Sequence, residues 1–116
     1  MTWKDRVMSE HEPLRVIVVG RDPEKMEPAV AVLESAGFAA IGVFSEAEAM
    51  TAIADRSALF AVVAGGFLDE AARGRLGAAA AARGAVLVTA AIGHDDPRKH
   101  FLDHVVPKLV DARDRR

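Results

Sequence analysis

The feature that most constrains this chain is a set of short apolar runs in which apolar and polar residues do not alternate. There are four such runs, at Leu14–Gly20, Phe38–Val43, Leu59–Ala64 and Ala85–Ala91. A strand that is apolar on both faces belongs in a parallel sheet covered by helices on both sides, because a sheet with one wet face shows alternation. The runs therefore predict a parallel sheet of buried strands.

Helix signals fill the first interval between these runs. Asp22 offers an N-cap, Pro23 stands at the first helical position, and Gly37 ends the segment. Pro28 leaves two alternatives, because proline inside a helix removes a backbone hydrogen bond. Either the helix begins near Glu27-Pro28, or its first turn is separate.

The next two intervals also have helical signatures. Ser45 and Glu48 form a capping-box pattern that predicts a helix over 46–55. An alanine-rich segment predicts a helix over 69–82, which Gly84 ends.

The segment after the fourth run predicts a last helix, which starts at Asp96-Pro97 and has a kink or break at Pro107. Its apolar residues fall on one helical stripe: Phe101, Leu102, Val105, Val106, Leu109 and Val110. The alternative is a fifth strand at 104–106. That strand would leave a very short crossover after Ala91, so the helix is favoured.

Strands and helices that alternate in this way specify an α/β fold with right-handed crossovers. We predict a three-layer α/β/α sandwich with a four-stranded parallel sheet in the order 2-1-3-4. The domain covers residues 14–113, after an N-terminal arm at 1–13 and before a charged tail at 114–116. Ligands of such sheets bind at the carboxyl ends of the strands. The loops at 20–22, 44–45, 65–69 and 91–96 are therefore the places to look for a site.

Composition removes several classes of function. The 15 basic residues are scattered and are outnumbered by 17 acidic ones, so nucleic acid is not an expected partner. The absence of cysteine excludes disulfides, thiolate catalysis and cysteine-based metal sites. No apolar run is long enough to span a membrane, and residues 1–13 are too polar for a signal peptide. We expect a cytoplasmic, bacterial protein without a cofactor or a membrane partner.

Four stretches together resemble the receiver domain of bacterial response regulators. They are V-I-V-V-G-R-D-P-E, S-E-A-E-A-M-T-A-I, L-F-A-V-V-A-G-G and A-V-L-V-T-A-A, and the resemblance covers about Leu14 to Ala91. It implies a flavodoxin-like fold and a place in signalling.

The residues that receivers use for phosphoryl transfer are absent. A receiver needs an acidic pair after its first strand to hold magnesium and an aspartate at the end of its third strand as the acceptor. The acidic pair falls here on Gly20 and Arg21, and the acceptor falls on Ala64 or Gly65. The resemblance therefore implies a pseudo-receiver that cannot be phosphorylated and acts as a protein-interaction or regulatory module.

The chain is also similar to a group of small bacterial receiver-like proteins without an established activity, through Val19-Gly20-Arg21, Gly65-Gly66 and His94. Backbone amides at Gly65 and Gly66 before a helix, with Arg21 nearby, could hold an anion. The plainer interpretation is that the glycines only permit a tight turn with positive φ. The alternative function is therefore a small-ligand, anion or nucleotide site made by Arg21, Gly65, Gly66 and His94.

Catalytic and metal chemistry have weak support. His100 and His104 are spaced to share a metal on one helical face, but their charged neighbours favour a solvated face, so no metal is predicted. No nucleophile elbow and no pair of carboxylates at strand ends is present, and we expect no enzyme activity.

Two features favour a homodimer, or a contact with another protein. Gly74 and Gly77 give the alanine-rich helix a smooth face that a partner helix could approach, although composition alone also explains them. Trp3 and Val7 lie on one side of a short helical arm, which either folds back or grips a second subunit.

Overall fold

The computed structural model describes residues 14–55, 59–65, 67–90, 99 and 101–115. Its strands are β1 (Leu14–Val19), β2 (Phe38–Val43), β3 (Leu59–Gly65) and β4 (Val86–Ala90). They form a four-stranded sheet in the order β2-β1-β3-β4, and every pair is parallel. The predicted sheet and its strand order are confirmed.

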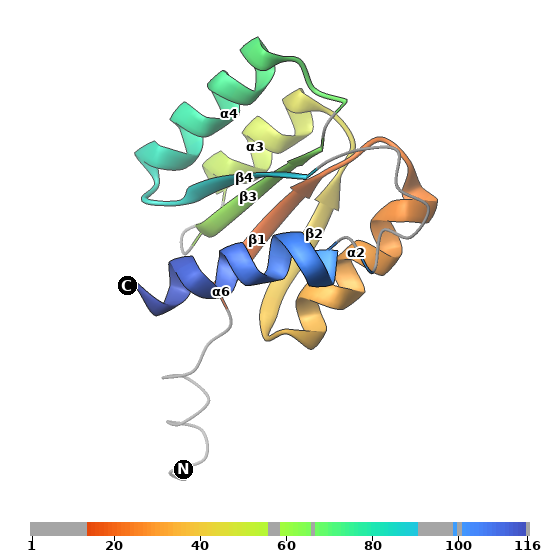
Figure 1. Cartoon of the computed structure of the whole chain (residues 1–116). Coiled ribbons are helices and arrows are strands. Elements are labelled where there is room, and N and C mark those ends of the chain that lie inside the picture. Colours follow the sequence, from red (N-terminus) through yellow and green to blue (C-terminus); the bar gives the residue numbers. More distant parts are fainter. Residues whose placement is uncertain (1–13, 56–58, 66, 91–98, 100, 116) are drawn as a thin grey trace, which may run out of the picture.

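The described helical segments are α2 (Pro23–Ser35), α3 (Glu46–Asp55), α4 (Glu70–Ala82), the π-helical turn η1 (Phe101–Val105) and α6 (Val106–Asp114). Helices α3 and α4 cover one face of the sheet, and α2 and α6 cover the other (Figure 1). The protein is therefore a three-layer α/β/α sandwich of the flavodoxin-like type, as predicted.

Burial of both faces explains the strand sequences. Val16–Val19 of β1 and Leu59–Ala64 of β3 are all buried. Alternate residues of each strand enter different cores, so that Val16 and Val18 face α2 and α6. Ile17 and Val19 face α3 and α4. None of these buried positions points to water, which is why the apolar runs do not alternate.

Side-chain caps start the helices where the sequence predicts. The Asp22 carboxylate accepts a hydrogen bond from the amide of Glu24 at 3.0 Å, and that of Asp69 accepts one from Ala72 at 2.7 Å. Ser45 Oγ accepts the amide of Glu48, as a capping box requires. Helices α2 and α4 are followed by Gly37 (φ 97°) and Gly84 (φ 74°), which adopt a backbone conformation that favours glycine.

Pro28 does not interrupt α2, so both predicted alternatives for this helix are wrong. The helix is continuous from Pro23 to Ser35 with Pro28 inside it. The hydrogen bond that proline cannot make would have gone to the carbonyl of Glu24. Glu24 is exposed in the first turn, where water can satisfy that carbonyl.

The C-terminal segment is helical, and the alternative of a strand at 104–106 is wrong. The predicted break occurs as the π-helical turn η1, which directly precedes α6 and Pro107. Phe101, Val105 and Leu109 are buried as expected, but Leu102 is 53% exposed. A spacing of four residues through the π-helical turn keeps the first three on one line and turns Leu102 outward.

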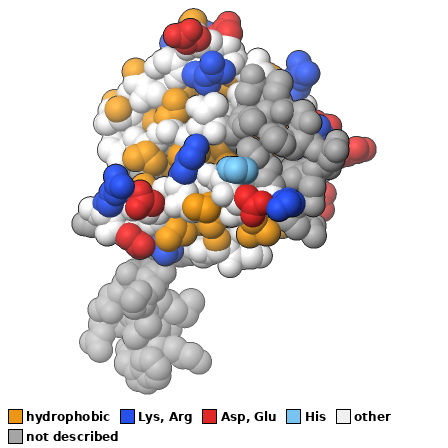
Figure 2. Space-filling model, viewed as in Figure 1, with side chains coloured by type: hydrophobic (Ala, Val, Ile, Leu, Met, Phe, Trp, Pro, Cys, Tyr) orange, Lys and Arg blue, Asp and Glu red, His pale blue; other side chains and the backbone are white. Residues whose placement is uncertain are grey.

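The surface mixes charge and apolar groups. On the face that carries α6, apolar side chains lie among Lys, Arg, Asp and Glu, and there is no broad patch of positive or negative charge (Figure 2). Within the described part of the chain, no helix has the length and hydropathy needed to cross a membrane.

Gly42 in β2 makes room for Met26 of α2. A Cβ atom at position 42 would lie 2.5 Å from Met26 Cγ and 2.6 Å from its Sδ. Met26 Cγ is close to the backbone and cannot swing away, since Met26 is itself buried. At Gly74 in α4, by contrast, a Cβ atom would meet nothing within 4 Å.

We therefore predict opposite effects for two glycine-to-alanine changes. Gly42→Ala should lower the free energy of unfolding by about 1–3 kcal/mol through overpacking. Gly74→Ala should raise it by about 0.5–1 kcal/mol, because alanine is the better helix former. Urea unfolding measures both, and a Gly42→Ala variant as stable as the original protein would contradict the packing argument.

Candidate functional site

The first candidate site is the carboxyl edge of the central strands, where β1 and β3 end. The loop after β1 carries Gly20 and Arg21, and the loop after β3 carries Phe67 and Asp69. Gly66 and His94, two residues of the predicted anion site, lie outside the described residues.

Gly65 is needed because the surrounding atoms leave no room for a side chain. A Cβ atom there would lie 2.8 Å from the carbonyl oxygen of Val19 and 3.1–3.2 Å from ring atoms of Phe67. Gly65 is not among the described glycines with positive φ. The interpretation of Gly65 as a glycine required for positive φ is therefore wrong, and close packing is the reason for it.

Phe67 covers this edge of the sheet. Its side chain is half-buried against the core between the sheet and helices α3 and α4. The guanidinium carbon of Arg21 lies 5.8 Å from the centroid of the Phe67 ring, within the range of a cation–π contact. The structure thus brings Arg21 and Gly65 close to the same ring.

Phe67 was not among the predicted site residues. The available signal was an aromatic residue directly after a Gly-Gly pair at a strand end. An aromatic ring at that place can fold back over the strand ends, because the glycines leave space beside them.

The acidic side chains near this edge cap helices. Asp22 caps α2 and Asp69 caps α4 through the hydrogen bonds given above. Among the described residues, no group of three histidine or acidic side chains could hold a metal ion. His104 is exposed in η1, and His100, its predicted partner, lies outside the described residues.

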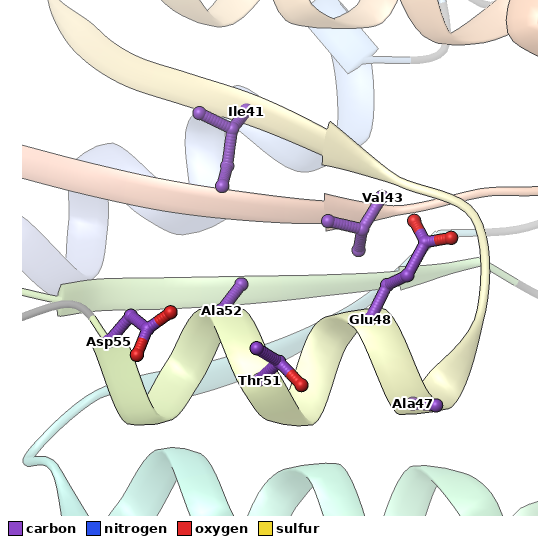
Figure 3. A pocket seen from close by; sticks show the side chains of 7 residues that line it. All are labelled: Ile41, Val43, Ala47, Glu48, Thr51, Ala52 and Asp55. Carbon is purple, nitrogen blue, oxygen red and sulfur yellow. The ribbon is translucent and has the colours of Figure 1, made fainter.

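A second candidate site is a shallow groove between the edge strand β2 and helix α3, here called the α3 groove. Its volume is about 460 Å³. Figure 3 shows the lining residues, which are Ile41, Val43, Ala47, Glu48, Thr51, Ala52 and Asp55. Ile41 and Val43 of β2 point toward α3 and form an apolar floor with Ala52, and two acidic residues stand along the helix.

The α3 groove was not predicted. It depends on the side chains of Ile41 and Val43 facing α3 at the open edge of the sheet. Periodicity along one segment cannot show how a helix and an edge strand lie against each other.

An ion pair holds α3, which forms one wall of the groove, against α4. Arg75 donates to both carboxylate oxygens of Glu46, at 2.5 Å from Nε and 2.8 Å from Nη2. These hydrogen bonds lower the pKa of Glu46 below its ordinary value, and burial opposes the shift only in part. The pKa of Arg75 is raised by the same contact. Near the other end of α3, Arg83 donates to the carbonyl of Ala54 at 2.5 Å.

The residues predicted for a dimer interface have different surroundings. Gly74 faces open space, whereas a Cβ atom at Gly77 would lie 3.3 Å from Leu87 Cδ2 of the protein's own sheet. Trp3 and Val7 lie outside the described residues.

In comparisons with known proteins, no family model, no curated protein and no solved structure matches this chain. The function is therefore argued from the chemistry of the two candidate sites.

Arg21 and Phe67 should be energetically coupled. Phe67→Ala should lower the free energy of unfolding by about 1–2 kcal/mol, less than a fully buried phenylalanine would cost. In a double-mutant cycle with Arg21→Ala, we expect a coupling energy of about 0.5–1 kcal/mol. Additive effects in denaturant unfolding would show that the contact is not stabilising.

The Glu46–Arg75 pair should make stability depend on pH. A carboxyl group whose pKa is lowered in the folded state stabilises that state at neutral pH, and this contribution is lost as the pH falls through the folded-state pKa. Glu46→Gln should therefore lower the melting temperature at pH 7, and the difference should shrink as the pH falls below the ordinary pKa of a glutamate.

The matched control is Glu27→Gln, which removes an exposed carboxyl group of α2 that is in no described ion pair. Its effect on the melting temperature should be smaller at pH 7. Equal effects of the two variants would contradict the role of the Arg75 contact.

Proposed function

We propose that this protein is a non-catalytic pseudo-receiver that acts as a protein-interaction or regulatory module and works as a homodimer. The observation that carries this proposal is the close packing at the ends of β1 and β3. Phe67 packs on Gly65 there, under the guanidinium group of Arg21.

The surroundings of the strand ends argue against phosphoryl transfer. Ala64 is fully buried, and a side chain at Gly65 would meet the carbonyl oxygen of Val19. Asp22 and Asp69, the acidic residues of the two adjacent loops, accept hydrogen bonds as helix caps. A phosphoryl acceptor and a magnesium site both require carboxylates aimed at the strand ends, which these positions do not favour.

An anion-binding or nucleotide-binding domain is the competing proposal, with Arg21, Gly65, Gly66 and His94 as its residues. The two of these that the structure describes have packing contacts that account for them. Arg21 lies over an aromatic ring, and Gly65 is required by its close neighbours. The interaction module therefore has the stronger support.

The first test asks whether the protein accepts a phosphoryl group. We expect that incubation with acetyl phosphate and Mg²⁺ leaves its intact mass unchanged, because no carboxylate stands at the end of β3. A phosphorylatable receiver treated in parallel is the positive control. An added phosphoryl mass on this protein would overturn the proposal.

Native mass spectrometry of the same sample tests the remainder of the proposal. A dimer without added mass supports the interaction module. A reproducible small-molecule adduct would overturn it in favour of the anion-binding domain, and Arg21→Ala would then show whether the carboxyl edge holds the ligand. A monomer at all concentrations would refute the homodimer.

A further inference from the structure

We propose that two copies of this chain pair edge to edge through β4, which joins their two sheets into one and brings their α4 helices together. This inference rests on the proposed homodimer and assigns it an interface. It uses neither the carboxyl edge of the sheet nor the α3 groove.

Strand β4 is an edge strand whose sequence does nothing to prevent pairing. Among the described residues, β3 is the only strand that pairs with it. Its sequence, V-L-V-T-A, has no charged residue and no proline, the residues with which proteins commonly protect an edge. Val86 and Thr89 point to opposite faces of the sheet, and both are exposed. The edge is therefore open to another strand on both faces.

The outer flank of α4 adds a second surface beside this edge. Helix α4 packs on both β3 and β4. A Cβ atom at Gly77 would lie 3.3 Å from Leu87 Cδ2, so Gly77 faces β4. Gly74 shares that flank of the helix, and a Cβ atom there would meet nothing within 4 Å. Arg75 points the other way, to Glu46 of α3. The two glycines thus lie on the side of α4 that is turned toward the open edge.

The spacing of the layers points to a second copy as the occupant of this edge. Neighbouring strands lie about 4.8 Å apart, so a helix over β3 and β4 and its symmetry mate would be two strand spacings apart, about 10 Å. Helices pack against each other at about 8–10 Å, and small residues at the contact permit that approach. A two-fold axis beside the middle of β4 would therefore pair the strands and the helices at once. Gly77 lies close to that axis, because it packs beside Leu87.

The other edge of the sheet is less suited to self-pairing. The α3 groove runs along β2, and its two charged lining residues, Glu48 and Asp55, are both acidic. A two-fold axis beside β2 would bring the carboxylates of two copies together, and like charges across a strand pair are destabilising. Strand β4 carries no charge that its own copy would repel.

Hydrogen exchange tests whether β4 is the paired edge. The β4 amides that β3 does not bind should exchange without unfolding in the monomer and become protected by the partner strand in the dimer. We expect slower exchange of peptides covering β4 at concentrations where native mass spectrometry shows a dimer than after dilution into the monomer range. Peptides covering the β2 edge are the internal control and should show little change. Equal exchange of β4 at both concentrations would overturn the inference.

A variant in α4 tests the helix contact. Gly74→Arg places bulk and charge on the outer flank, at a position that is open in the single chain. It should raise the dimer dissociation constant at least about tenfold, which corresponds to about 1.4 kcal/mol. Ala82→Arg is the matched control, because Ala82 is exposed on the flank of Arg75, seven residues earlier in the same helix. It should leave dimerisation unchanged.

A charge exchange at Thr89 tests the strand contact. Thr89→Lys and Thr89→Glu should each weaken the homodimer, because like charges would meet near the two-fold axis. An equimolar mixture of the two variants should form mostly the heterodimer, which native mass spectrometry resolves by mass. Thr51→Lys and Thr51→Glu make the same changes at an exposed position of α3 and should mix in statistical proportions. Circular dichroism checks that every variant is folded.

The outcomes separate this inference from the proposed function. A dimer that persists in folded Gly74→Arg and in both Thr89 variants would overturn the inference and leave the homodimer in place. Statistical mixing of the two Thr89 variants would do the same. A protein that is monomeric throughout would refute both.

Discussion

The burial of β1 and β3 on both faces is the constraint on which the remainder of this structure depends. Val16–Val19 and Leu59–Ala64 have no exposed member, so each strand must carry a helical layer on both sides. Two separate apolar cores result, with α2 and α6 over one and α3 and α4 over the other. This arrangement leaves β2 and β4 as the two edges and places all strand ends at one border.

That border is where a protein of this architecture ordinarily places its chemistry, and here side chains pack closely on the described ends of β1 and β3. Gly65 allows β3 to approach Val19 and the ring of Phe67 so closely that no side chain fits. Arg21 stands over the same ring, where it contributes a contact without being buried. These contacts pack the ends of β1 and β3, and the acidic side chains of the two adjacent loops, Asp22 and Asp69, cap helices.

The fold was predictable from the sequence because its signals are local. Apolar runs without alternation, caps such as Asp22 and Asp69, and terminating glycines each act within a few residues. The prediction for Pro28 was wrong. The free-energy cost of proline in a helix depends on whether water reaches the carbonyl group that the proline leaves unpaired. The cover formed by Phe67 and the α3 groove are tertiary features. They depend on how residues from different segments lie together, which a single sequence does not show.

The charge of the remaining open surface decides what kind of partner the domain can take. The α3 groove lies on a side of the sandwich, along the edge strand β2. Its floor is apolar and its charged residues, Glu48 and Asp55, are both acidic. Phosphate backbones are repelled by such a surface, whereas a peptide with an apolar side chain between basic ones is attracted. Arg75 and Arg83 donate hydrogen bonds that tie α3 to the segment that includes α4, so less ordering free energy would be lost if a molecule bound in the groove.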